Sequence, residues 1–397
     1  MEWKSVTKNQ EGLIKIPKRW LHVHYYEAMN ILFRFENSLR VFVYVILKNE
    51  FLDKWQDCTF SIAGSDPISI KGLAEKRIAQ AENFGYLGFN IKAPLMHLTS
   101  GELVDLVTSE GYWPKFKACF KGNKEIIKNK LLEIGTIRNS LAHFRPIKPE
   151  DIELVKQNSR HTLLGVEECL SNIFMQGLRV PTNTGEEWYK SISTLGTDLI
   201  TTAPYYSADE CWINVKLNFE TPILSKNVFG EKLCQFWLAK INTPNILLNH
   251  NVLTKYVTFL SEALSYPRLS EKFDIQINKD LNFVFRKNIL VKNHEVIVGQ
   301  FREVLGKITE ECDLLSKDHL ARGSLVETTN GSSFFFEPKG EKSGKWQHHY
   351  IDLLQPYQPN HPEEYWGEYH FTSDVVAGST RYPWMPADIS EEEGYTD

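Results

Sequence analysis

One stretch decides how this chain is interpreted: Lys128-Asn129-Lys130-Leu131-Leu132-Glu133-Ile134-Gly135-Thr136-Ile137-Arg138-Asn139-Ser140-Leu141-Ala142-His143-Phe144-Arg145-Pro146. It opens as an amphipathic run, which predicts a helix over residues 124–142. Pro146 cannot continue a helix and also restricts the residue before it. Arg138 and His143 therefore fall at a helix end beside a turn, where polar side chains can reach a ligand.

The side chains at this helix end have complementary chemistry. Arg138 is a permanent cation suited to phosphate, and His143 can exchange a proton near neutral pH. Asn139 lies four residues before His143 and shares its helix face. Arg138 and His143 are about 140° apart around an ideal helix, so one helix aims them poorly at a single atom. The combination suits cleavage of a phosphodiester without a metal, and the alternative is an ordinary solvated helix face.

The pattern Arg138-Asn139, three residues, His143 at the end of a long helix resembles the signature of HEPN domains. The segment 27–43, with Glu36 and Leu39-Arg40, resembles the opening helix of such domains. Residues 98–106 and 113–116 are similar to the middle helices of a subgroup found in prokaryotic defence proteins. The resemblance covers roughly residues 20–178, which is under half of the chain.

This resemblance implies a metal-independent endoribonuclease that leaves 2′,3′-cyclic phosphate and 5′-hydroxyl ends and needs no cofactor. It implies Arg138, Asn139 and His143 as catalytic residues, in a homodimer whose two motifs form a composite site. Glu36 would most simply support Arg138 or Arg40 by an ion pair. The resemblance also implies a toxin-like effector of abortive infection against phage, with an antitoxin, a phage-derived trigger or another defence component as a possible partner.

Two other classes of protein stay open. Some domains of this kind bind RNA, nucleotides or proteins without cutting, so the chain could be an adaptor of a defence complex. Four histidines near the C-terminus, at 348, 349, 361 and 370, could instead hold a metal in a metal-dependent hydrolase. No cysteine joins them at metal-type spacing, so we expect no metal site.

The charge distribution favours RNA contact by the first part of the chain. The net charge is −5, but residues 1–178 hold 24 Lys and Arg against 20 Asp and Glu, and the remainder holds 21 against 30. Several cations lead into the motif or follow it, and they predict a surface that attracts phosphate, with a solvated helix face as the alternative. The residues expected to bind RNA are Lys124, Lys128, Lys130, Arg145 and Lys148.

Composition places the protein among globular chains with a sizeable core, because 42% of its residues are hydrophobic. The longest wholly apolar run, residues 41–47, is too short to cross a membrane, and from the polar residues at the start of the sequence we expect no secretory signal. The six cysteines lie scattered and suggest no disulfide framework. We therefore expect a cytoplasmic protein without membrane contact.

The pattern of apolar residues predicts a multidomain chain. An all-α helical bundle is expected over residues 1–180, with helices at 25–48, 71–83, 100–108, 124–142 and 149–176. Pro181 and Gly185 indicate a linker. An α+β domain with a mixed or antiparallel sheet is expected over 186–397, its last dozen residues loose.

Within the second domain, alternating residues predict strands at 213–219, 273–277, 282–285 and 295–298. Helices are expected at 231–240, 253–264 and 300–315. Asn330-Gly331, between two runs of β-forming residues, predicts a hairpin turn.

Overall fold

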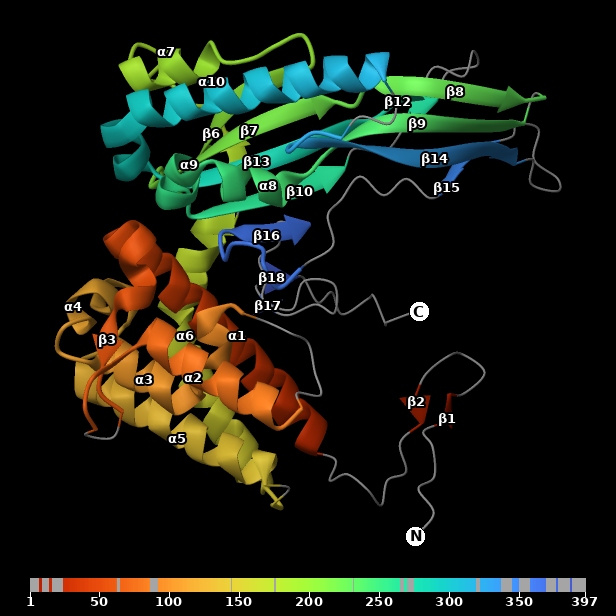
Figure 1. The fold of residues 1–397 in the computed structure, drawn as a ribbon. Helices are drawn as coiled ribbons and strands as arrows, with labels where there is room; N and C mark the ends of the chain where they lie inside the picture. The colour runs from red at the N-terminus through yellow and green to blue at the C-terminus, as the bar shows by residue number, and fades with distance from the viewer. Residues whose placement is uncertain are drawn as a thin grey trace.

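The computed structural model describes residues 7–8, 14–15, 24–62, 65–85, 92–143, 145–174, 176–230, 232–264, 268–269, 275–318, 322–336, 345–349, 358–368, 376–377 and 386–387. An N-terminal helical region is followed by a mixed α+β region, as the sequence predicts (Figure 1). The described helices of the first region are α1 (His24–Phe51), α2 (Ile70–Asn83), α3 (Ser100–Thr108), α4 (Trp113–Phe116), α5 (Lys124–Ala142) and α6 (Pro149–Phe174). Between them lie the 3-10 turns η1 (Leu52–Asp57), η2 (Pro94–His97) and η3 (Lys117–Cys119), and the short strand pairs β1 (Thr7–Lys8) with β2 (Ile14–Lys15) and β3 (Thr59–Phe60) with β4 (Ile68–Ser69).

Helix α1 is the centre of the helical region. Residues 41–45 of this helix are all fully buried, so it is apolar around its whole circumference there, as expected of a helix surrounded by others. Helix α5 buries only one stripe, Ile127, Leu131, Ile134, Ile137 and Leu141, at the spacing of an amphipathic helix. Its opposite face is left for contacts outside this bundle.

Local capping sets where these helices begin. The Asn123 side chain accepts a 2.9 Å hydrogen bond from the Ile126 N–H and caps α5. Thr99 is the N-cap of α3. Thr99 and Glu102 exchange reciprocal side chain-to-backbone hydrogen bonds in a capping box.

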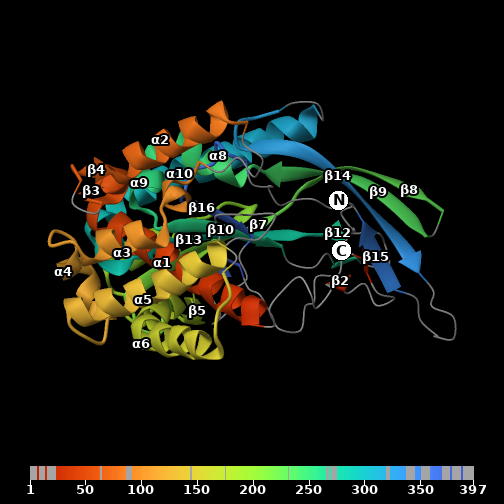
Figure 2. The same cartoon turned by 90° about the horizontal axis from the view of Figure 1, so that it is seen from below.

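The α+β region contains two main sheets. Six strands lie in the order β16-β10-β13-β7-β6-β5, all antiparallel except the parallel pair β10 and β16, and four strands lie in the order β15-β14-β9-β8. Helices α7 and α10 cover one face of the six-stranded sheet, and the four-stranded sheet projects past the helical region (Figures 1 and 2). The elements are β5 (Gln176–Arg179), α7 (Glu187–Ser193), β6 (Ile200–Ser207), β7 (Trp212–Glu220), β8 (Ile223–Phe229), β9 (Leu233–Ile241), α8 (Thr243–Asn249), α9 (Asn251–Tyr256), β10 (Phe259–Leu264), β11 (Arg268–Leu269), β12 (Ile275–Gln276), β13 (Asn278–Arg286), α10 (Lys287–Lys317), β14 (Val326–Phe336), β15 (Lys345–His349), β16 (Tyr365–Glu368), β17 (Val376–Ala377) and β18 (Pro386–Ala387).

The last turns of α1 join the two regions. The Tyr44 hydroxyl donates a 2.6 Å hydrogen bond to the Thr258 carbonyl, and the Thr258 hydroxyl donates to Asn49 Oδ1 at 3.1 Å. The Lys48 ammonium lies 2.5 Å from Glu364 Oε1 and donates to the Thr254 carbonyl at 2.8 Å. One hydrophobic cluster runs through both regions, so they share a core. The expected boundary between residues 180 and 186 stays a prediction.

The prediction of a helix at 231–240 is wrong, because residues 233–241 form strand β9. Cys234, Phe236 and Leu238 are fully buried, whereas Gln235 between them is exposed. Leu, Ala, Lys and Gln favour helices locally, but pairing with β8 and β14 on both sides overrides that preference.

Three further expectations are wrong for related reasons. Residues 253–264 divide into α9 and β10, which pairs with β13 along its length. Residues 295–298 lie inside α10, where Ile297, Phe301, Val304 and Ile308 recur at helical spacing. Asn330-Gly331 lies within the continuous strand β14, with Gly331 opposite Phe236, because β9 and β15 pair with β14 on either side. Of the strand expected at 273–277, residues 273–274 lie outside the described part, and 275–276 form β12.

We expect Gly165→Ala to destabilise the fold by about 1–3 kcal/mol, because an added Cβ has no room. At Gly165 in α6 that Cβ would lie 2.0 Å from the carbonyl oxygen of Cys119. Gly306→Ala in α10 is the matched control, since its Cβ meets nothing within 4 Å and alanine is the better helix former. Urea denaturation of both variants measures the difference, and equal stabilities would contradict the close approach of α6 and η3.

Candidate functional site

The motif lies at the C-terminal end of α5, as expected. Helix α5 stays regular through Ala142, and His143 is its C-cap with φ −98° and ψ 13°. The His143 N–H donates to the Asn139 carbonyl at 3.1 Å, and the Arg145 N–H donates to the Ser140 carbonyl at 2.9 Å. These bonds fix the backbone that carries His143 and lead the chain toward α6.

Glu36 of α1 forms ion pairs with two arginines, Arg40 and Arg138. Its carboxylate forms an ion pair with Arg40 through Oε1 and lies 3.5 Å from the Arg138 Nε through Oε2. Glu36 keeps 13% of its side chain exposed and Arg138 keeps 36%. The interpretation of Glu36 as the ion-pair partner of Arg138 or Arg40 fits this geometry, because it binds both. Glu36 thus contacts the Arg138 guanidinium from the α1 side, and part of the Arg138 side chain stays open to solvent.

Arg40 is a packing residue rather than a group open to a ligand. Its guanidinium donates to the carbonyls of Leu95 and Leu98, each at 3.2 Å, and to Asn37 Oδ1 at 2.9 Å. Burial lowers the pKa of Arg40, the Glu36 carboxylate opposes this, and the nearby Arg138 charge lowers it further. Arg40 therefore ties α1 to the η2 turn and positions Glu36 for Arg138. Sequence reasoning missed Asn37, although its spacing of three residues from Arg40 was a usable signal.

The three motif side chains do not converge within one chain. Arg138 is half-buried against α1, while Asn139 and His143 are exposed. Because α5 is regular through Ala142, Arg138 and His143 keep the divergence of about 140° that an ideal helix gives them. The chain therefore presents a cation and an imidazole on neighbouring faces of α5 rather than together in one closed site.

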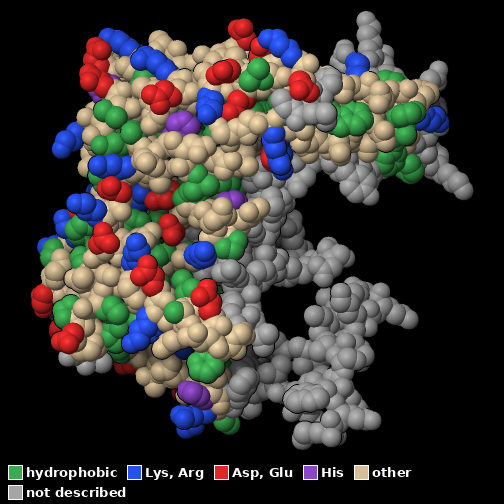
Figure 3. All heavy atoms as spheres, in the orientation of Figure 1, with side chains coloured by type: hydrophobic (Ala, Val, Ile, Leu, Met, Phe, Trp, Pro, Cys, Tyr) green, Lys and Arg blue, Asp and Glu red, His purple; other side chains and the backbone are tan. Residues whose placement is uncertain are grey.

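Some lysines near the expected basic surface form ion pairs with glutamates. Lys124 pairs with Glu110, and Lys121 lies 3.6 Å from Glu168. Lys128 and Lys130 are half-buried on α5, and Arg145 and Lys148 are exposed beyond it. Figure 3 shows cationic and anionic side chains interspersed over the helical region on the face it displays. Any RNA-attracting surface is therefore narrower than the lysine series suggests, and Lys128 is the member that shares a side of α5 with Asn139 and His143.

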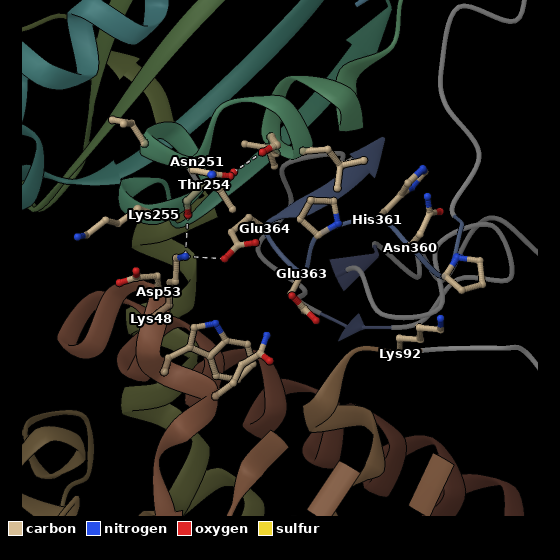
Figure 4. Close-up of a pocket in the computed structure, with 17 residues that line it drawn as sticks. Lys48, Asp53, Lys92, Asn251, Thr254, Lys255, Asn360, His361, Glu363 and Glu364 are labelled. Atoms are coloured by element: carbon tan, nitrogen blue, oxygen red, sulfur yellow. Dashed lines mark hydrogen bonds and ion pairs between the residues drawn. The ribbon is translucent and has the colours of Figure 1, made fainter. Parts of the chain in front are cut away.

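Most of the C-terminal histidines that could hold a metal lie outside the described residues. The side chains of His348 and His349, and all of His370, lie outside the described residues, and His361 lines a cavity between the helical and α+β regions (Figure 4). Within the described part, no group of three or more His, Cys, Asp and Glu residues is placed to hold a metal ion. No described helix has the length and apolarity needed to cross a membrane.

Comparisons with known proteins do not assign this chain to a family. Neither models of protein families, nor curated proteins, nor solved structures gave a match to this chain. The HEPN resemblance therefore rests on the motif and its helical setting.

The two arginines that flank Glu36 should differ in their effect on stability. Arg40→Ala should cost about 3 kcal/mol, because it removes one partner of a nearly buried ion pair together with three further hydrogen bonds. Arg138→Ala should cost less than about 1 kcal/mol, because that arginine is partly solvated. Equilibrium unfolding in urea tests this, and an equal loss in both variants would show that Arg138 is a packing residue as well.

Proposed function

We propose that this chain is a metal-independent endoribonuclease with Arg138, Asn139 and His143 as its catalytic residues. The observation that carries the proposal is the placement of Arg138. The Glu36 carboxylate contacts the Arg138 guanidinium from the protein side, and the Arg138 side chain stays partly exposed. Arg138 lies about one and a half turns before His143, which is exposed and forms the helix cap. The packing arginine Arg40 is enclosed, whereas the partly exposed Arg138 side chain can bind an anion.

The chemistry needs a base, an acid and a charge for the phosphorane. His143 would take the proton of the ribose 2′-hydroxyl as its oxygen forms a bond to phosphorus, or would return a proton to the 5′-oxygen as the bond from phosphorus to that oxygen breaks. Arg138 would stabilise the non-bridging oxygens on which negative charge develops. Asn139 would orient His143 or the phosphate. The products would be a 2′,3′-cyclic phosphate and a 5′-hydroxyl, with no water consumed.

A homodimer completes the site in this proposal. The divergence of Arg138 and His143 around α5 prevents one chain from placing both on a single phosphate. A second copy that packs its α5 end against the first would bring the histidine of one chain toward the arginine of the other. Glu36 would then keep Arg138 aligned in each half-site.

Such an activity would harm its own cell if it were constant. We place the protein in the cytoplasm as a toxin-like effector of abortive infection, held in check or released by an antitoxin, a phage-derived trigger or another defence component. The acidic α+β region, which shares a core with the helical region through α1, is suited to transmit such control.

Incubation of the purified protein with total RNA in EDTA tests the proposed reaction. We expect cleavage, and a loss of about 10²-fold or more on His143→Ala or Arg138→Ala, since each removes a proton carrier or the phosphate charge. Lys148→Ala, at an exposed cation beyond the motif, is the matched control and should change the rate only severalfold. Wild-type cleavage rates in either motif variant would refute the catalytic assignment, and RNA binding without cleavage would favour the adaptor.

Mixing two inactive variants tests the composite site. In a mixture of Arg138→Ala and His143→Ala chains, half of the dimers would be mixed, and each would hold one intact site. We therefore expect recovery of about a quarter of the wild-type activity in random exchange of protomers. A mixture that exchanges protomers, as size and mass measurements can show, yet stays inactive would contradict the composite site.

A further inference from the structure

Two cysteine thiols meet where η3 packs against α6. The Cys169 thiol donates a hydrogen bond to the Cys119 sulfur. In the sequence, η3 comes just before α5 and α6 comes just after it, so the contact joins the two segments that flank the motif helix. It brings together two groups that can form a covalent bond with each other.

The backbone places these two thiols side by side. Gly165 lets α6 approach η3 so closely that a Cβ at this position would lie 2.0 Å from the Cys119 carbonyl oxygen. Cys169 lies four residues after Gly165, so it is on the same face of α6, one turn further along. Lys121 and Glu168 also face each other across this junction, with 3.6 Å between Nζ and Oε1. The thiol contact therefore follows from the packing of two segments.

Cys119 is the more acidic thiol of the pair. The hydrogen bond from Cys169 lowers the pKa of Cys119, burial opposes this, and the Arg286 charge lowers the pKa further. The same hydrogen bond raises the pKa of Cys169, and so do burial and the charge of Cys119. The thiolate is the form of cysteine that attacks an oxidant. Cys119 therefore supplies the nucleophile, and Cys169 is a thiol held beside it.

Both cysteines are partly accessible. The turn η3 contains no buried residue, and Cys119 and Cys169 are each half-buried, so a small oxidant can reach them. By contrast, Cys58, Cys234 and Cys312 are buried, and burial raises the pKa of each. The contacting pair therefore combines access with a thiolate.

A metal ion is the alternative ligand for a pair of thiols. A structural zinc site needs four ligands. Within the described part of the chain, no group of three or more His, Cys, Asp and Glu residues is placed to hold a metal ion. The positive charge of Arg286, which acts on both thiols, also disfavours a metal cation between them. Oxidation therefore fits the pair better than metal binding does.

We propose that Cys119 and Cys169 form a reversible disulfide when the protein reacts with a peroxide, so that the junction of η3 and α6 is an oxidant-sensitive site. The proposal does not depend on ribonuclease activity. Such a bond suits the cytoplasmic location proposed above, because cytosolic disulfides are usually transient or redox-sensing.

The reaction takes place in two balanced steps. The Cys119 thiolate attacks one oxygen of hydrogen peroxide, so an S–O bond forms, the O–O bond breaks, and the hydroxide that leaves takes up a proton to become water. Cys119 is then a neutral sulfenic acid, and its charge no longer raises the pKa of Cys169. Cys169 loses its proton and attacks the Cys119 sulfur, so the S–S bond forms, the S–O bond breaks and a second water leaves. The two sulfurs together lose two electrons, which reduce the peroxide to water.

Peptide mapping of the oxidised full-length protein tests the pairing. The reduced protein is treated with a small excess of hydrogen peroxide, its free thiols are alkylated, and it is digested without reductant. We expect the intact protein to lose the mass of two hydrogen atoms, and a disulfide that dithiothreitol reverses to join the peptides of Cys119 and Cys169. A disulfide between chains or between another pair of cysteines, or six thiols that all stay free, would overturn the proposal.

Serine variants assign the two roles. In Cys169→Ser, Cys119 should stay as a sulfenic acid that dimedone labels, because the second thiol is missing. In Cys119→Ser no disulfide should form. Cys211→Ser, which removes an exposed thiol, is the matched control and should form the disulfide at the wild-type rate. Loss of the disulfide in Cys211→Ser, or a sulfenic acid on Cys169 in Cys119→Ser that forms as fast as the one on Cys119, would contradict these roles.

Thermal unfolding tests whether the fold accepts the bond. The disulfide would close a loop that contains the whole of α5, which packs beside α6 (Figures 1 and 2). Because such a cross-link restricts the unfolded chain, the oxidised protein should melt about 5 °C higher than the reduced protein. Peroxide should not raise the melting temperature of Cys169→Ser. A lower melting temperature for the disulfide-bonded wild-type protein would show that the two sulfurs are not placed to join, and would contradict the proposal.

Discussion

Charges within and at the ends of one buried helix have to be paired, and much of this structure follows from that constraint. Helix α1 is enclosed by the rest of the molecule along residues 41–45, and an unpaired charge at its buried positions would cost several kcal/mol. Glu36 and Arg40 pair with each other within the helical region. Lys48, three turns further on, pairs with Glu364 of the α+β region. The same helix thereby contacts Arg138 near its middle and borders the cavity between the regions at its C-terminal end.

Helix α1 connects the candidate nuclease site to the cavity at the junction of the two regions. Glu36 and Lys48 are about 18 Å apart along α1 at 1.5 Å per residue.

Sequence reasoning succeeded where the signal is local. The motif helix runs over residues 124–142 as expected, and α2 and α6 begin within one residue of their predicted starts. Amphipathic spacing, caps and prolines act within a few residues, so they can be recognised in the chain itself. Sequence reasoning failed for β9, β10 and β14, because their conformation depends on strands that are distant in the sequence. Lys240, for example, lies opposite Glu327 in the paired strands.

The sequence by itself determined the order of a helical region and an α+β region, the helix that carries Arg138, Asn139 and His143, and the divergence of these side chains around it. Only the tertiary structure decided which arginine is enclosed and which is open. Arg40 and Arg138 are the same residue type, but α1 and the η2 turn surround the first with four acceptors, while the second meets Glu36 alone among the described residues. Burial and partner geometry arise from packing between distant segments, and no local pattern encodes them.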